Sequence, residues 1–287
     1  MDIAVIGAGR VGTSLAVAWQ KSGHRIVAVS GRGATAERAA RFLPGVLVEP
    51  SPAAARLSEV VVVATPDGAI AEAVEELVTA GSLGSAQVVA HVSGSRGLEA
   101  LAAAEAAGSR ALALHPLQSF PSVDVGVDRL AGSAMAVTAR TEETFSLGER
   151  LAMDAGTRPF RLPDAARPLY HAAAVFAANY VATTMVMADR VMRAAGLEDP
   201  VALFAPLSRG VLENVVSLGP TAALTGPAAR GEDQAIRRNL EALAAARPEA
   251  VGSYVALARV ALDVADEAGR LPAERRRAVE EVLDRWT

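Results

Sequence analysis

The sequence predicts an α/β protein in which a doubly wound parallel sheet is followed by an all-helical C-terminal domain. Three observations lead to this prediction. Valine-rich runs alternate with helical stretches over the first half of the chain, and a glycine-rich turn directly follows the first run. From Asp164 onward the helical stretches are long and no convincing strand is found. We therefore expect two domains, residues 1–160 and 161–287.

The strands of the first domain are expected in short runs rich in β-branched residues. They cover residues 2–6, 25–30, 59–64, 87–93 and 110–115, with a further candidate at 134–138. Continuous apolar runs separated by helices are typical of a parallel sheet that is buried on both faces. Such a sheet is wound with right-handed crossovers.

The second domain is expected to consist of helices over residues 164–195, 200–217, 231–245, 248–268 and 272–286. Asp164 is placed to cap the first of these helices and Gly196 to end it. In the last helix Arg276 and Glu280 form an i,i+4 pair. The three arginines at 275–277 are expected on a solvated helix face.

Residues 168–188 contain no Asp, Glu, Lys or Arg, and the stretch is long enough to cross a membrane. It also contains His171, Asn179 and two threonines, whose polar groups would be costly in lipid. We therefore expect a buried helix between the domains and no membrane span.

Composition excludes several classes of protein. An apolar content of 51% over 287 residues is enough for one or two well-packed domains and is not that of a disordered chain. Cysteine is absent, which excludes disulfides, thiolate nucleophiles and Cys-ligated metals, and we expect no metal site. The net charge of −4, without a long basic block, argues against nucleic-acid binding. The start Met-Asp-Ile lacks the positive charge of a signal peptide, so we expect a cytoplasmic protein.

A dinucleotide site is predicted at the glycine-rich turn Gly7-Ala8-Gly9-Arg10-Val11-Gly12. The turn lies between the first expected strand and a helix, and a second strand follows within about thirty residues. In this context Gly7 permits the tight turn, Gly9 lets a pyrophosphate approach the backbone, and Gly12 permits close packing of helix and strand. The first helical turn, which begins with Arg10 and Val11, supplies N–H groups and partial positive charge to the phosphates.

The end of the second strand predicts NADP(H) rather than NAD(H) as the cofactor. NAD-binding proteins usually place an acid about 20 residues after the glycine motif, where it bonds the ribose 2′-hydroxyl. No acid occurs from Ile26 to Ala36. Ser30 can instead donate to a 2′-phosphate, and Arg32 can clamp that phosphate with two hydrogen bonds.

Further candidate residues lie where expected strands end, which is where ligands bind in open α/β sheets. Those after the third and fourth strands are expected beside the cofactor, and those after the fifth beside the substrate. For His91 and His115 the alternative is a hydrogen-bonded, purely structural histidine. The candidates are Thr65, Pro66, Ser93, His115, Gln118 and Ser119.

Four motifs together resemble a known bacterial family. They are IGAGRVG at 6–12, HPLQSFP at 115–121, YHAAAVFAANY at 170–180 and LTGPAARGED at 224–233. Members of this family join a Rossmann-like domain to a helical domain of unknown function. They belong to the wider group of ketopantoate reductases, pyrroline-5-carboxylate reductases and β-hydroxyacid dehydrogenases. The resemblance implies a homodimer that uses NADPH to reduce a small 2-oxo acid, most simply ketopantoate to pantoate in pantothenate biosynthesis.

The chain departs from that wider group at one catalytic position. Ketopantoate reductases and β-hydroxyacid dehydrogenases carry a helix lysine four residues before an asparagine and use it as the general acid. If Asn179 matches that asparagine, Val175 stands at the lysine position, and Lys21 is the only lysine in the chain. His171 is the expected replacement, with Asn179 bonding the developing oxyanion and His115 as second choice of acid. A buried structural histidine and an asparagine that packs between helices are the alternatives.

On an uninterrupted α-helix, His171 and Asn179 would lie two turns and about 80° apart, so both could face the substrate. In the 224–233 motif, Thr225 and Arg230 are expected to face the substrate carboxylate, with an ordinary helix–helix turn as the alternative. Two other functions fit the same fold. An imine reductase of the pyrroline-5-carboxylate type would demand less of a general acid, and a non-catalytic NADP-binding sensor would demand none.

Overall fold

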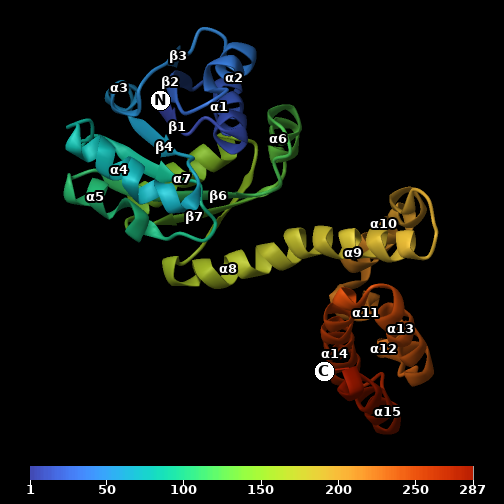
Figure 1. Cartoon of the computed structure of the whole chain (residues 1–287). Helices are drawn as coiled ribbons and strands as arrows, with labels where there is room; N and C mark the ends of the chain where they lie inside the picture. The colour runs from blue at the N-terminus through green and yellow to red at the C-terminus, as the bar shows by residue number, and fades with distance from the viewer. Residues whose placement is uncertain (287) are drawn as a thin grey trace. The chain divides into compact units, whose positions relative to one another are not determined.

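The structure, a computed structural model, describes residues 1–286. The chain divides into two compact units, Met1–Ala178 and Asn179–Thr287. The first unit contains all the strands of the described residues and the second is helical (Figure 1). The change from strands to helices falls after Arg161, whereas the compact units divide after Ala178.

An eight-stranded sheet forms the framework of the first unit, in the order β3-β2-β1-β4-β5-β6-β7-β8. All six expected strands are present, and every pair but one is parallel, which confirms the doubly wound Rossmann-like sheet. The strands are β1 (Asp2–Ile6), β2 (Arg25–Ser30), β3 (Leu47–Val48), β4 (Val60–Val63), β5 (Val88–His91), β6 (Arg110–Leu117), β7 (Ala134–Ala139) and β8 (Arg158–Arg161).

The pair β6 and β7 is antiparallel, so the prediction of a wholly parallel sheet is wrong at this point. The connecting helix α6 (Val123–Leu130) does not carry the chain back across the sheet. It lies against α1 (Arg10–Lys21), where the Ser14 hydroxyl donates a 3.3 Å hydrogen bond to the Val123 carbonyl. The chain therefore re-enters the sheet from the edge at which β6 leaves it, which makes the next strand antiparallel.

Two edge strands have no clear signal in the sequence. β3 comprises two exposed residues, and β8 reads Arg-Pro-Phe-Arg. An edge strand is paired on one side only, so it needs neither a continuous apolar run nor the absence of proline. Pattern-based prediction finds the inner strands and misses these two.

Helices cover both faces of the sheet (Figure 1). On one face α1 and α7 (Glu142–Asp154) share a core with Trp19, whose indole nitrogen donates a 2.7 Å bond to the Leu151 carbonyl. On the other face α4 (Ile70–Thr79) packs with α3 (Ser51–Arg56). The other helices of this unit are α2 (Thr35–Phe42), α5 (Ala102–Ala106) and α8 (Arg167–Ala174). Because β1, β4, β5 and β6 run in parallel, their carboxyl ends meet at one edge of the sheet.

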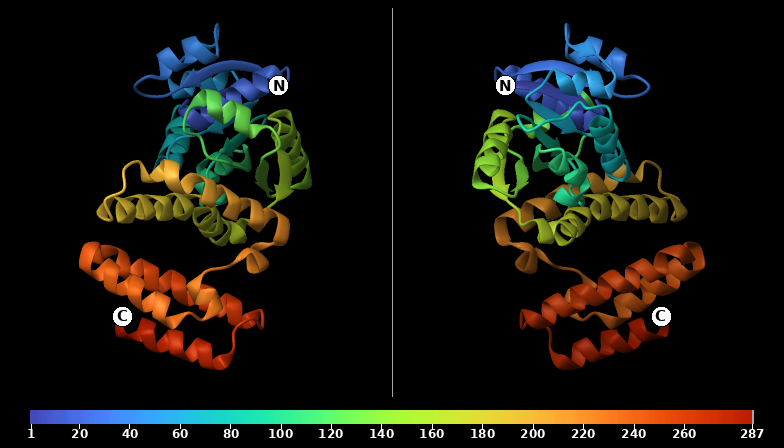
Figure 2. Two further views of the ribbon diagram at one scale, coloured as in Figure 1. Left: turned by 90° about the vertical axis from the view of Figure 1, so that its right-hand side faces the viewer. Right: turned by 90° about the vertical axis from the view of Figure 1, so that its left-hand side faces the viewer.

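The second unit is an all-helical assembly, as predicted. In Figure 2 the orange and red helices α13, α14 and α15 lie side by side, around a core that includes Ile236, Leu262 and Val279. The expected Arg276–Glu280 pair forms at 2.9 Å, and Arg276 also bonds Asp263 at 2.6 Å, so it is not merely solvated. The helices are α9 (Val181–Ala194), α10 (Pro200–Leu218), α11 (Pro220–Ala223), α12 (Pro227–Arg230), α13 (Asp233–Ala246), α14 (Val251–Glu267) and α15 (Ala273–Leu283).

The helical stretch from residue 164 to 194 is not a single α-helix. A 3₁₀ turn (Asp164–Ala166) leads into α8, and a π-helical segment (Val175–Tyr180) separates α8 from α9. Asp164 does not cap α8; its carboxylate instead accepts a 3.0 Å bond from the Leu98 amide. A π-helical turn holds more residues than an α-helical turn, so the angle of about 80° expected between His171 and Asn179 does not apply.

By length and composition, Asp164–Ala194 and Pro200–Leu218 could each cross a membrane. Within the most apolar 18 residues of each stretch, the buried share is 0% in Asp164–Ala194 and 6% in Pro200–Leu218. The expectation of a buried helix at 168–188 is therefore wrong for the single chain. Its apolar side chains are exposed or half-buried, and in α10 most are exposed while Phe204 is buried.

Candidate active site

The glycine-rich turn has the geometry that a dinucleotide needs. Gly7 adopts φ +90°, and a Cβ there would lie 2.8 Å from the backbone of Ala64 and Thr65. A Cβ at Gly12 would lie 2.8 Å from the Gly7 carbonyl oxygen. α1 begins at Arg10 with no side-chain cap and no acid in its first turn. Its first N–H groups and its positive dipole end are therefore left for an anion.

Thr65 adds a second sign of a ligand at this turn. The residue follows β4, which pairs with β1, and its hydroxyl is buried without a hydrogen-bond partner. Buried hydroxyl groups nearly always have a partner, so an unsatisfied one marks a place where a bound molecule completes the site. Pro66 is exposed beside it and begins the turn into α4. The residues at this turn therefore fit the dinucleotide that the sequence predicts.

The end of β2 differs in detail from the prediction. The Ser30 hydroxyl is buried and lies 3.0 Å from the Ser51 hydroxyl, whereas Arg32 is exposed. A third residue, Arg38, was missed: its Nε donates a 2.8 Å bond to the carbonyl of Ala8 inside the glycine-rich turn. Its position on α2, six residues after Arg32, is the feature of the sequence that could have identified it as a cofactor residue. The guanidinium groups of Arg32 and Arg38 thus come from the segment directly after β2, as recognition of a phosphate would require.

A cluster of polar rings lies at the carboxyl edge of the same sheet. His115 on β6 and Tyr170 on α8 are joined by a 2.8 Å hydrogen bond between the His115 Nδ1 and the Tyr170 hydroxyl. His171 is next to Tyr170, and its ring centre lies 6.4 Å from that of His115. The structure therefore brings together two of the predicted catalytic residues and adds Tyr170, which the sequence analysis passed over within its own motif.

Gly94, directly after Ser93, lets both imidazole rings approach the backbone closely. A Cβ at this position would lie 2.7 Å from the His115 Nε2 and 2.9 Å from the His171 Nδ1. The His171 Nδ1 is buried and has no hydrogen-bond partner. Two ring nitrogens therefore converge beside a residue with no side chain, and one of them is unsatisfied.

The protonation states of the pair follow from burial. Burial, helped by the nearby Arg167 guanidinium, lowers the pKa of His115 to about 4. Burial also raises the pKa of Tyr170 to about 12. At neutral pH His115 is therefore uncharged and Tyr170 keeps its proton. The phenol can pass a proton to the neutral imidazole without forming an imidazolium ion if the imidazole gives up its other proton in the same step.

The Asp67 carboxylate interacts electrostatically with the histidines of this cluster. Burial alone would raise its pKa, but hydrogen bonds from Ser95 and Ser93, with the nearby histidines, hold the pKa below its usual value. The Ser95 hydroxyl donates to it at 2.6 Å. The Ser93 hydroxyl also accepts bonds from the amides of Ser95 and Arg96, so this predicted cofactor residue shapes the turn after β5.

Arg167 fixes the position of the cluster by hydrogen bonds to the sheet. Its side chain is completely buried and donates to the carbonyls of Ser93 (2.9 Å) and Ala113 (3.3 Å) and to the Thr138 hydroxyl (3.0 Å). These acceptors lie on or beside β5, β6 and β7, while Arg167 itself begins α8. It therefore ties the helix that carries Tyr170 and His171 to the sheet. Nothing in the local sequence pattern predicts this buried arginine.

The remaining candidates of the first unit have structural partners. His91 is buried between the Gly97 carbonyl and the Ser93 amide, which supports its structural reading. Gln118 and Ser119 are exposed in the turn after β6, where both bond Arg129: the Gln118 side-chain amide donates to its carbonyl (3.4 Å), and its guanidinium donates to the Ser119 hydroxyl (2.9 Å). They are near the end of the strand that carries His115.

Three predicted residues lie in the second unit. Asn179 is exposed in the π-helical segment, and Thr225 is exposed before α12. Arg230 pairs with Glu232 at 2.7 Å, so its charge is already partly neutralised on the surface. Each of these three residues keeps its predicted role only as a proposal.

Comparisons with known proteins agree with this architecture. Residues 1–116 match the family described as Rossmann-like domain, and residues 133–261 match the domain of unknown function DUF2520. The expected pairing of a Rossmann-like domain with a helical domain of unknown function is thereby confirmed. No match is found among curated proteins.

Several solved structures are similar over nearly the whole chain. A Bacteroides fragilis protein assigned as an NADP oxidoreductase is 25% identical, with a TM-score of 0.77, over 91% of this chain and 98% of that one. An imine reductase from Myxococcus stipitatus, solved with NADP⁺, is 19% identical, with a TM-score of 0.66, over 100% and 99%. A pyrroline carboxylate reductase from Plasmodium falciparum, solved with NADP, is 13% identical, with a TM-score of 0.60, over 94% and 97%. At these identities the last two show the fold.

Proposed function

Because the chain joins a Rossmann-like domain to a DUF2520 domain, we propose that it is an NADP(H)-dependent oxidoreductase that reduces a small 2-oxo acid, with ketopantoate as the first candidate. The observation that carries the proposal is the placement of two sites at one sheet edge. The glycine-rich turn after β1 fits a dinucleotide, and the His115–Tyr170–His171 cluster after β6 offers groups that bind a carbonyl oxygen and supply a proton.

The cofactor assignment rests on charge as well as on shape. NADPH, when bound, would supply the hydride. Gly7, Gly9 and the first turn of α1, from Arg10 and Val11 to Gly12, would hold its pyrophosphate. Ser30, Arg32 and Arg38 would bind the 2′-phosphate that distinguishes it from NADH. The similar structures assigned to or solved with NADP support the same choice.

The roles of the substrate groups follow from their bonding. His171 would donate its unpaired Nδ1–H to the substrate oxygen as negative charge develops there. Asn179, Thr225 and Arg230 are proposed as further substrate contacts. Gln118 and Ser119, in the turn after β6, are proposed as substrate contacts as well.

An imine substrate is the second candidate function. It is favoured by the similarity to imine reductases and to a pyrroline carboxylate reductase, and by the absence of lysine near the site. A protonated imine needs no further proton at nitrogen when hydride arrives, so a weak proton donor would suffice. Side-by-side assays of NADPH oxidation with ketopantoate and with pyrroline-5-carboxylate separate the two candidates. Binding of NADPH without turnover of either compound would favour the remaining alternative, a non-catalytic NADP-binding sensor.

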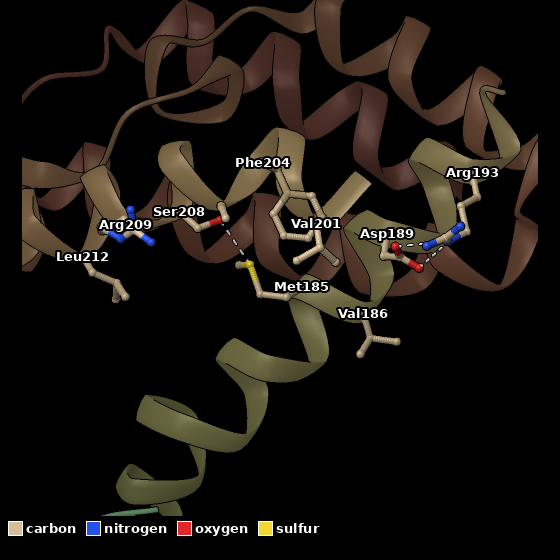
Figure 3. A pocket seen from close by; sticks show the side chains of 10 residues that line it. Met185, Val186, Asp189, Arg193, Val201, Phe204, Ser208, Arg209 and Leu212 are labelled. Carbon is tan, nitrogen blue, oxygen red and sulfur yellow. Dashed lines mark hydrogen bonds and ion pairs between the residues drawn. The ribbon is translucent and has the colours of Figure 1, made fainter. Parts of the chain in front are cut away.

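We also propose that the protein acts as a homodimer in the cytoplasm. The helices α9 and α10 leave several large apolar side chains uncovered, among them Leu203, Leu207 and Val216, which is 87% exposed. A pocket of about 670 Å³ lies on these helices, and Figure 3 shows the side chains that line it. Among them the Ser208 hydroxyl donates a 3.2 Å hydrogen bond to the Met185 sulfur.

The same pocket contains the ion pair between Asp189 and Arg193, which would be costly in lipid and is easily kept at a protein interface. A second copy is the default occupant of such a face. Sedimentation of the wild type and of Leu207→Arg tests this: the wild type should be a dimer and the variant should dissociate. A wild type that sediments as a monomer would exclude the proposal.

A further inference from the structure

We infer that the Tyr170 hydroxyl supplies, through the His115 imidazole, the proton that reduction of a carbonyl substrate requires. The inference rests on the proposed function and names the proton source that this function leaves open. It starts from the absence of lysine near the site and from one hydrogen bond, between Tyr170 and the Nδ1 of His115.

The contact is built by two elements that are far apart in sequence. His115 lies on β6 and Tyr170 on α8, and their rings meet edge to face at 5.5 Å with an interplanar angle of 85°. Arg167 fixes the start of α8 three residues before Tyr170 through its bonds to the sheet. The geometry is therefore held by buried groups rather than by a flexible surface contact.

The two protonation states allow the phenol to be the donor of this bond, and we assign it that role. At neutral pH the phenol keeps its proton and the imidazole is neutral. When the phenol donates to Nδ1, the single proton of the neutral imidazole must lie on Nε2. That nitrogen is the one beside Gly94, where a side chain would lie 2.7 Å away. The proton on Nε2 therefore lies on the side of Gly94, where the unpaired His171 Nδ1 also lies.

The proton transfer balances in both atoms and charge. As hydride reaches the carbonyl carbon, the π electron pair moves to oxygen, and this oxygen takes the proton from the His115 Nε2. The His115 Nδ1 takes the proton of the Tyr170 hydroxyl in the same movement, which leaves a neutral imidazole and a phenolate. Afterwards Nδ1 returns its proton to the phenolate as Nε2 takes a proton from water, which restores the starting state. The net reaction consumes the 2-oxo acid, NADPH and one proton, and yields the 2-hydroxy acid and NADP⁺.

The charged groups around the pair suit this transfer. The buried Arg167 guanidinium is close enough to lower the pKa of Tyr170 against the effect of burial, so it stabilises a phenolate. His91 and His171 face His115 from the other elements at this edge, and Asp67 is the carboxylate there. The alkoxide that hydride addition generates is a stronger base than a phenolate, so proton transfer to it runs downhill.

The first test reads the proton position directly and needs no substrate. Imidazole nitrogen NMR shifts of the full chain at neutral pH should show His115 protonated on Nε2 and accepting at Nδ1. In Tyr170→Phe the Nδ1 shift should move toward that of a free imidazole. Tyr254→Phe is the matched control, because it also removes a phenol, bonded at 2.9 Å by the Asn239 side-chain amide in the second unit, and should leave His115 unchanged.

The second test is kinetic. Tyr170→Phe should lower kcat for a 2-oxo acid by roughly 10²–10⁴-fold while NADPH affinity is kept, and should reduce the rate with a preformed protonated imine much less. His115 protonated on Nδ1 in the wild type would overturn the inference, as would full turnover of the 2-oxo acid by Tyr170→Phe. If the wild type turns over neither substrate, the proposed function fails, while the NMR result still decides whether Tyr170 donates to His115.

Discussion

The Arg167 guanidinium donates a 2.9 Å hydrogen bond to the carbonyl oxygen of Ser93, which joins the first turn of α8 to the end of β5. Two further bonds, to Ala113 and Thr138, attach the same side chain to β6 and β7. The helix that carries Tyr170 and His171 thus has its position set by one buried cation.

Replacing this arginine should cost stability. Arg167→Ala leaves three buried acceptors without a donor, and each bond to a charged group contributes on the order of 1.5–3 kcal/mol. We expect the free energy of unfolding in urea to fall by more than about 2 kcal/mol. Arg150→Ala, on the exposed side of α7, is the control and should change it by less than about 0.5 kcal/mol. Equal effects of the two substitutions would refute the anchoring role.

The cofactor preference should depend on Arg32. Arg32→Asp places a carboxylate where the 2′-phosphate is proposed to bind, so NADPH affinity should fall by roughly ten- to a hundredfold while NADH affinity is kept or improved. Titration of cofactor fluorescence with each nucleotide measures both. Arg150→Asp, on the exposed side of α7, serves as control, because it makes the same change of charge away from β2. An unchanged NADPH affinity in Arg32→Asp would remove the phosphate-clamp assignment.

A side chain at position 94 should disturb both histidines at once. The Cβ of Gly94→Ala would lie 2.7 Å from the His115 Nε2 and 2.9 Å from the His171 Nδ1, so at least one ring must move. We expect a large loss of kcat with little change in NADPH affinity. Gly68→Ala is the matched control, because a Cβ there meets nothing within 4 Å. If Gly94→Ala kept full turnover, the space beside Gly94 would not be where the substrate reacts.

The buried histidines should make stability fall in acid. His91 and His115 have pKa values lowered to about 4, mainly by burial, against 6.5 in the unfolded chain. Between pH 6.5 and 4 the unfolded chain therefore binds more protons than the folded one, so the free energy of unfolding decreases as pH falls. The decrease is on the order of 3 kcal/mol for each histidine. Urea unfolding of the wild type and of His115→Asn at pH 7 and pH 4.5 measures it, and the variant should show the smaller decrease.

The fold was predictable because the inner strands are continuous apolar runs and Gly7, Gly9 and Gly12 mark a turn with a specific geometry. The edge strands β3 and β8 were not, since one paired side requires no apolar pattern. The antiparallel entry of β7 depends on the contact of α6 with α1, which is a tertiary fact.

The motifs of the candidate site could be predicted from the sequence, but the hydrogen-bond partners of their residues could not. His115 stood out because it ends the fifth expected strand, and His171 because it lies on the helix of Asn179, where the usual lysine is missing. His115 is hydrogen-bonded to Tyr170, whereas the Nδ1 of His171 has no protein partner. Both facts depend on how α8 packs on the sheet. That placement is set by Arg167, whose burial no local pattern reveals, and the π-helical segment changes the face on which Asn179 emerges.

The most direct test of the central claim is transfer of deuterium from NADPH labelled at C4 of the nicotinamide, followed by mass spectrometry of the product. With ketopantoate as the only added substrate, we expect pantoate that carries one deuterium from one of the two labelled faces. Tight binding of NADPH without deuterium in the product of either ketopantoate or pyrroline-5-carboxylate would contradict the claim that this chain is a reductase for these substrates.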